Sequence, residues 1–134
     1  MSGRVLTCSA IVDIATDRSV YGRAFLVAAV ELGMTFATPS TALLQAWAAV
    51  PPQARALLEL FLDAPAVVIE DLDASVTSRA GVRAHPAHQA GRFDVAAAHA
   101  VDVAIIRGLA ILTAEPDPLQ AIDPTVEIEE LPSP

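Results

Sequence analysis

The chain has 134 residues, which fits one compact domain of ordinary size and excludes two large ones. Hydrophobic residues make up 54% of it and charged residues 18%, a balance that supports a packed core and excludes a disordered chain. The formal net charge of −8 at pH 7 opposes long-range attraction to polyanions such as RNA.

Hydropathy and spacing predict short strands that alternate with helices along the chain. Apolar runs with the composition of buried strands lie at residues 4–7, 35–37, 66–69, 110–113 and 126–131, the last as an edge strand. Helical segments are predicted at residues 10–15, 20–32, 40–50, 53–62, 72–82, 95–107 and 116–122. A loop is expected at residues 83–92.

Capping residues support several of these boundaries. Ser9 and Asp94 are expected to cap the helices that follow them, because their side-chain oxygens can accept from free backbone N–H groups. Gly33 and Gly108 are placed to end the helices before them. The inner side of helix 95–107 is expected to consist of Val95, Ala98, Val101, Ile105 and Ile106.

This order of elements predicts an α/β sandwich with a central, mainly parallel sheet of four or five strands. A single domain is expected at residues 1–131, followed by a frayed tail at residues 132–134. Ligands of such sheets bind beyond the carboxyl ends of the strands. The first candidates for a site are therefore residues 7–9, 38–40 and 113–117.

Glu115 and Asp117 bring two carboxylates to the start of the last predicted helix. Hard divalent ions prefer oxygen ligands, so this pair is a candidate site for Mg²⁺ or Mn²⁺. Acids are also common in the first turn of a helix, where they interact favourably with its dipole. On spacing alone, the dipole is the simpler explanation.

Four stretches, in order, resemble the motifs of PIN domains, particularly those of the VapC-type toxins of toxin–antitoxin pairs. Residues 5–11 resemble the opening strand, which in the family ends in an Asp followed two residues later by Ser or Thr. Residues 39–47 resemble a helix that carries a Glu, and residues 94–101 a motif with an Asp two residues before a His. Residues 110–119 resemble a strand followed by Thr, a small residue, Asp, Pro and Asp. The resemblance covers nearly the whole chain and implies a PIN-like three-layer α/β/α sandwich.

The sequence departs from the family at the acids that hold one or two divalent ions. Thr7 stands in place of the first Asp, Gln45 in place of the Glu, and Ala97 in place of the Asp before the His. With Ser9, these are the family-site positions that are neutral in this chain. Because anionic oxygens compensate the ion for its lost waters, we expect the fold to be kept and the metal site to be largely lost.

Three acids remain in the matching motifs. Glu115 replaces an Asp of the fourth motif and keeps its charge, while Asp94 and Asp117 match residues that the family uses as helpers or caps. If the protein is an active enzyme, the resemblance assigns catalysis to Asp94, Glu115 and Asp117, and the metal to Glu115 and Asp117. Asp13 is a further candidate under that interpretation.

Two hypotheses about function follow. The first is a non-catalytic or very weakly active relative that works by protein–protein binding, with no cofactor expected. The alternative is an active Mg²⁺- or Mn²⁺-dependent endoribonuclease, the toxin of a toxin–antitoxin pair, with an altered ligand set and RNA as its substrate. An unrelated flavodoxin-like binding domain remains as a third interpretation if the motif matches are accidental.

The resemblance also implies partners. VapC-like proteins commonly pair through their helices, so we expect a homodimer, with helices 20–32 and 53–62 as candidate surfaces. An antitoxin-like protein is the other expected partner. The sequence contains no secretory signal or membrane span, and its single cysteine, Cys8, fits a reducing compartment, so a cytoplasmic location is expected. His99 is expected to be a satisfied, partly buried histidine rather than a ligand.

Overall fold

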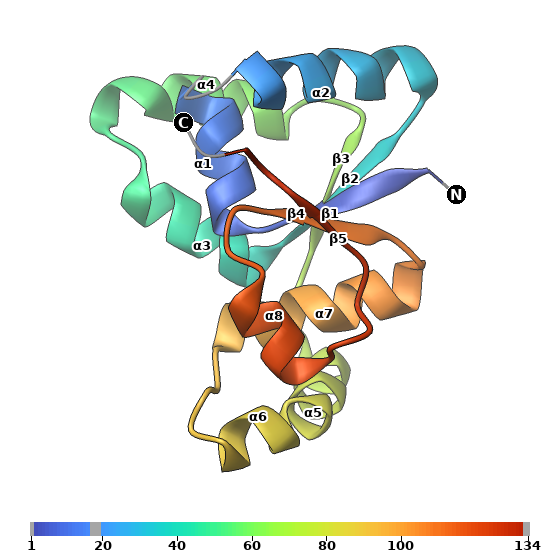
Figure 1. Ribbon diagram of the computed structural model, residues 1–134. Coiled ribbons are helices and arrows are strands. Elements are labelled where there is room, and N and C mark those ends of the chain that lie inside the picture. Colours follow the sequence, from blue (N-terminus) through green and yellow to red (C-terminus); the bar gives the residue numbers. More distant parts are fainter. Residues whose placement is uncertain (1, 17–19, 133–134) are drawn as a thin grey trace.

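The computed structural model describes residues 2–16 and 20–132, with the backbone alone for residues 20–23. Its strands form one parallel sheet in the order β3-β2-β1-β4-β5 (Figure 1). These strands are β1 (Gly3–Leu6), β2 (Thr35–Pro39), β3 (Val67–Glu70), β4 (Ala110–Thr113) and β5 (Ile128–Glu130). The predicted α/β class with a central parallel sheet is confirmed. Residues 133 and 134 of the predicted tail lie outside the described residues.

Helices connect the strands and cover both faces of the sheet (Figure 1). Within the described residues they are α1 (Cys8–Thr16), α2 (Val20–Leu32), α3 (Ser40–Ala49), the 3-10 helix η1 (Pro52–Ala54), α4 (Arg55–Leu62), α5 (Ala74–Arg83), α6 (His85–Gln89), α7 (Val95–Arg107) and α8 (Asp117–Ile122). Gly33 follows α2 with φ 67°, as predicted for its terminator.

Alternating side chains of the central strands divide the core into two layers. Leu6, Phe36 and Leu112 face the layer formed with α1 to α4. Val5 and Ile111 face the layer formed with α5 to α8, where α7 supplies most of the buried alanines and valines. This is the three-layer α/β/α arrangement, because each parallel strand must bury side chains on both faces of the sheet.

Local polar contacts fix α7 against its neighbours. The Asp94 carboxylate accepts a hydrogen bond from the Ala97 backbone N–H at 2.8 Å, as predicted for a cap, and Gly108 ends the helix with φ 67°. Asp102, almost completely buried, accepts from Arg79 at 2.8 Å and from Arg83 at 3.2 Å. These two ion pairs join α5 to α7.

Three local predictions are wrong. Ser9 does not cap the first helix, because α1 begins at Cys8 and the Thr7 carbonyl already accepts from the Ile11 N–H at 3.0 Å. Residues 83–92 are not simply a loop, since α6 forms there with a proline in its first turn, where the missing N–H costs nothing. Some residues assigned to the inner side of α7 are instead exposed, namely Val95, Ile105 and Ile106.

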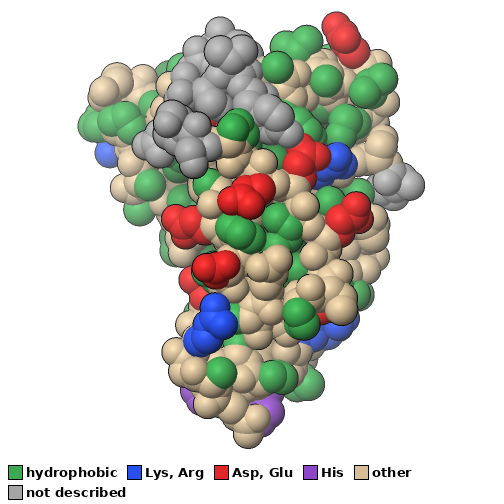
Figure 2. Space-filling view, viewed as in Figure 1, with side chains coloured by type: hydrophobic (Ala, Val, Ile, Leu, Met, Phe, Trp, Pro, Cys, Tyr) green, Lys and Arg blue, Asp and Glu red, His purple; other side chains and the backbone are tan. Residues whose placement is uncertain are grey.

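The surface reflects the acidic carboxyl-terminal half of the chain. Residues 63–134 carry 12 acids and 4 arginines, and Figure 2 shows carboxylates at several separate points of the face around β5 and α8. On this side the Arg4 guanidinium lies 2.8 Å from the Glu129 carboxylate and links β1 to the edge strand β5. Within the described ranges, no helix combines the length and the apolar character that a membrane crossing requires.

Candidate functional site

A cleft of about 640 Å³ opens at the carboxyl ends of the central strands. Because β1 is followed in the sheet by β2 on one side and β4 on the other, the strand order reverses here, which is where α/β folds bind ligands. The cleft is lined by Thr7, Cys8, Ser9, Val12, Ala42, Gln45, Ala48, Ala49, Asp94, Ala96, Ala97, Thr113, Glu115, Pro118 and Leu119.

Three hydroxyl groups form the polar base of this cleft. Parallel pairing of Leu6 with Leu112 places the following residues, Thr7 and Thr113, at the same edge of the sheet. The Thr7 hydroxyl donates to the Leu112 carbonyl oxygen at 3.1 Å, and its oxygen lies 3.1 Å from the Ser9 hydroxyl oxygen. Ser9 in turn lies 3.4 Å from the Thr113 hydroxyl oxygen. A connected, uncharged network therefore joins the ends of β1 and β4.

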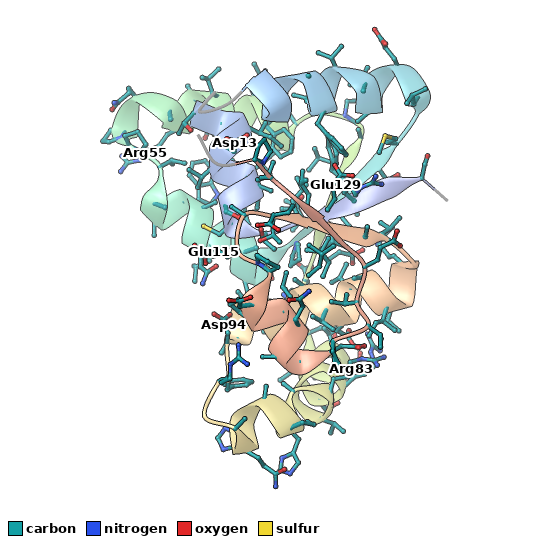
Figure 3. All side chains as sticks on the ribbon, in the orientation of Figure 1. Asp13, Arg55, Arg83, Asp94, Glu115 and Glu129 are labelled. Atoms are coloured by element: carbon teal, nitrogen blue, oxygen red, sulfur yellow. The ribbon has the colours of Figure 1, made fainter. Side chains whose placement is uncertain are left out.

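The backbone after β4 is held by the same hydroxyls. The Ala114 N–H donates to the Ser9 hydroxyl oxygen at 2.9 Å, and the Glu115 N–H donates to the Thr113 hydroxyl oxygen at 3.0 Å. These bonds place the exposed Glu115 side chain at the turn between β4 and α8, beside the cleft (Figure 3).

A further part of the cleft wall comes from α3 and the start of α7. Gln45 lies on the second turn of α3, where its exposed amide reaches the cleft. Asp94 enters the cleft wall while one of its oxygens caps α7 (Figure 3). Ala97 is buried in the same wall and offers only a methyl group. Residues predicted from four separate motifs therefore meet at one place.

The predicted acids are not all part of the cleft. Asp94 and Glu115 line it, whereas Asp117, in the first turn of α8, does not. Asp13 lies further along α1 (Figure 3), where its side chain is buried and takes part in a polar interaction away from the cleft lining. The structure thus brings together two of the four acids considered for an enzyme.

The described lining of the cleft carries a small negative charge. Among the described residues, those that line it include two carboxylates and no arginine, lysine or histidine. In the part of the chain that the structure describes, no three His, Cys, Asp or Glu side chains are arranged to hold a metal ion. Burial, and secondarily the Glu115 charge, raise the pKa of the Cys8 thiol, which therefore stays protonated at neutral pH.

Some lining residues carried no signal in the sequence. Ala42, Ala48, Ala49 and Ala96 shape the walls, and small apolar residues at helical spacing indicate packing as readily as a cleft. In contrast, residues 38–40 follow β2 and were candidates by position, yet they do not line the cleft. The chain turns into α3 immediately after β2, so the cleft is reached one to two turns later.

His99 is more deeply buried than predicted. It is 1% exposed, and its Nδ1 atom lies 2.9 Å from the Thr41 hydroxyl oxygen, so α7 is tied to the first turn of α3. Burial lowers the pKa of His99, an effect that the nearby Asp102, Glu70 and Asp71 oppose. The predicted hydrogen bond is present at Nδ1, whereas Nε2 meets hydrogen-bond geometry with no group of the described residues, so the ring is only partly satisfied.

Comparison with known proteins identifies the fold. No family profile and no curated protein matches the chain. A chain in the crystal structure of VapBC2 from Rickettsia felis bound to a DNA fragment from their promoter superposes on it with a TM-score of 0.75 and 18% sequence identity. The match covers 96% of this chain and 98% of that chain. At this identity it establishes a shared PIN-like fold.

Proposed function

We propose that this chain is a VapC-toxin-like PIN-domain protein that has lost the metal-dependent nuclease site and acts by binding another protein. The observation that carries the proposal is the convergence of Thr7, Gln45, Ala97 and Glu115 on one cleft. Three of these four positions are uncharged where the resembling family has acids. The cleft is retained while most of its anionic oxygens are missing, and we take residues 1–131 as the functional domain.

The chemistry of divalent ions supports a lost metal site. Mg²⁺ gives up bound waters reluctantly, and carboxylates must replace them. Here the Thr7 hydroxyl proton is committed to the Leu112 carbonyl, and one Asp94 oxygen is committed to the Ala97 N–H. Among the described lining residues, only the Glu115 carboxylate and the second Asp94 oxygen remain as negatively charged oxygen ligands for a metal ion. Two partly available carboxylates are too few for a stable site without further ligands.

Sites, rather than folds, carry chemistry, so the same fold without its acids is suited to a binding role. The structural neighbour is part of a VapBC2 assembly with DNA. By analogy we propose an antitoxin-like protein as a partner of this chain. The cleft, with its alanine walls and uncharged base, would receive part of that partner.

A homodimer is the second proposed assembly. Apolar side chains that are about half exposed or more line α2 and α4, at Val27, Val30, Leu32, Leu57 and Leu60. Both helices belong to the same layer of the sandwich, and large exposed apolar groups are typical of protein interfaces. Leu60→Glu should convert a dimer into a monomer in sedimentation equilibrium. The matched control, Val82→Glu on the opposite layer, should leave it dimeric, and a wild-type monomer would remove this part of the proposal.

The runner-up is a metal-dependent ribonuclease with an altered ligand set, and one observation favours it. Asp94 and Glu115 share the cleft, which is the arrangement a reduced metal site would need. An assay of RNA cleavage with Mg²⁺ or Mn²⁺ separates the two functions. We expect the wild type and Glu115→Gln to be equally inactive. Metal-dependent cleavage by the wild type that disappears in Glu115→Gln would establish the ribonuclease instead.

A further inference from the structure

The two edges of the sheet differ in how well they are protected. β5 is three residues long and carries Glu129 and Glu130. β3, at the other edge, exposes the β-branched residues Val68 at 36% and Ile69 at 46%. No strand of the described residues pairs with its outer side. An open, apolar, β-branched edge is the usual template for strand addition.

The register shows which backbone groups this edge presents. The Phe36 N–H donates to the Ala66 carbonyl at 2.8 Å, so residues 66, 68 and 70 face β2. The intervening Val67 and Ile69 therefore direct their backbone groups outward. The Val67 N–H donates to the Ala64 carbonyl oxygen at 3.0 Å. The Val67 carbonyl and the N–H and carbonyl of Ile69 therefore remain for an incoming strand.

A pocket of about 250 Å³ lies beside this edge, on the face of the sheet that α7 covers. Its polar lining residues are Glu70, Asp71, Arg79, His99, Asp102 and Arg107. Glu70 is paired with Arg107, and Asp102 with Arg79, whereas Asp71 takes part in no ion pair of the described residues. The exposed side chain of Ile106 adds an apolar wall.

The pocket also contains a polar atom without a partner. His99 is 1% exposed and its Nε2 atom meets hydrogen-bond geometry with no group of the described residues, although the Asp71 backbone lies beside the ring. Buried polar atoms are nearly always satisfied in folded proteins. In the tautomer in which Nδ1 donates to the Thr41 hydroxyl, Nε2 is an acceptor, and a lysine or arginine that enters the pocket can donate to it.

The charges around β3 distinguish two possible occupants of this edge, a second copy of the chain and a segment of another polypeptide. Between Arg55 and Arg79 the chain has no basic residue, and Asp63, Asp71 and Asp73 flank β3 on both ends. Antiparallel pairing with β3 of a second copy would bring these acidic ends together, which is unfavourable. A strand with a basic side chain would instead complement Asp71 at the pocket.

We propose that the outer edge of β3 accepts an extended segment of a partner polypeptide, which places a lysine or arginine side chain in the adjoining pocket. This inference rests on the proposed role in protein binding and assigns it a surface separate from the cleft. Backbone hydrogen bonds to Val67 and Ile69 supply the register, and the pocket supplies the preference for a basic residue.

The test is selection from a displayed library of random octapeptides on the wild-type protein. Enriched peptides should alternate apolar residues with lysine or arginine. Binding should slow hydrogen exchange of the Ile69 amide at least about tenfold, because that N–H enters the new ladder. Ile69→Lys should weaken binding by about tenfold or more, whereas Val82→Lys, an equally drastic change at a 76% exposed position of α5, should not.

Several outcomes overturn the inference. These are no enrichment, enrichment of acidic peptides, or binders that tolerate Ile69→Lys or leave the Ile69 amide unprotected. Self-association that Ile69→Lys abolishes would assign the edge to a second copy. Each result is distinct from failure of the proposed function, because that is read from Leu60 and Glu115 variants, which lie outside β3 and its pocket.

Discussion

The Thr7 hydroxyl donates a hydrogen bond to the Leu112 carbonyl oxygen at 3.1 Å and so links β1 to β4 at the base of the cleft. In PIN domains an anionic side chain is expected at this position. Here the same position stabilises the unliganded fold, because a hydroxyl can donate to a carbonyl and a carboxylate cannot. Under the proposed function, a metal ligand of the resembling family is replaced here by a structural contact.

Thr7→Asp should destabilise the protein. The new carboxylate would face the Leu112 carbonyl oxygen and the negative charge of Glu115, and the lost hydrogen bond would cost about 1–3 kcal/mol. Thr7→Asn introduces a side chain with the shape of aspartate but without its charge, and it should lower the free energy of unfolding clearly less. Urea unfolding of both variants measures the difference. Equal losses would show that charge at this position is unimportant.

Asp94 should behave as a helix cap. Its carboxylate accepts the Ala97 N–H at 2.8 Å, and Asp73 accepts the Val76 N–H of α5 at 2.9 Å in the same way. Asp94→Ala is expected to lower the free energy of unfolding by about 1 kcal/mol, and Asp73→Ala is expected to lower it as well. Asp94→Asn and Asp73→Asn should keep most of the stability that the caps contribute, because the asparagine side-chain oxygen can accept the same hydrogen bond. If Asp94→Ala were instead stabilising, repulsion between Asp94 and Glu115 would outweigh the cap.

His99 should make stability depend on pH. Burial lowers its pKa below the ordinary value of 6.5, so the unfolded chain binds this proton more readily than the folded protein. The free energy of unfolding should be highest above pH 6.5 and fall as the pH drops from there toward the lower folded pKa. His99→Gln should flatten this part of the profile. Thermal unfolding between pH 5 and pH 8 is the measurement, and an unchanged slope in His99→Gln would assign the dependence to other groups.

Sequence pattern was sufficient for the architecture. Period and composition predicted all five strands because parallel strands are buried on both faces, and Asp94, Gly33 and Gly108 marked helix ends through capping chemistry. Helix α6 was missed, since the five residues His85–Gln89 are too few to show a helical period, although a proline is tolerated in their first turn. Val95 and Ile106 were predicted to be buried but are exposed. The apolar residues of α7 extend around more than one side of the helix, so the sequence alone does not show which side the rest of the protein covers.

The site was only partly predictable. Motif order indicated Thr7, Gln45, Ala97 and Glu115, which the fold does bring to one cleft. Asp117 stands two residues from Glu115, in the first turn of α8, and does not line the cleft, which the spacing of the motif does not indicate. The pocket beside β3 was not predicted, since Glu70, His99 and Arg107 come from separated elements whose packing the sequence does not state.

The central claim is that the cleft keeps its shape but no longer binds a divalent ion, and a Mn²⁺ titration followed by thermal unfolding tests it most directly. The wild-type unfolding midpoint should not move at millimolar Mn²⁺. The triple variant Thr7→Asp, Gln45→Glu, Ala97→Asp should unfold at a midpoint that rises with Mn²⁺, because binding adds about 2.7 kcal/mol to its free energy of unfolding at a hundredfold excess over its Kd. A variant with asparagine at residues 7 and 97 and the native Gln45 should not respond. A wild-type shift, or a folded triple variant that ignores the metal, would contradict the account.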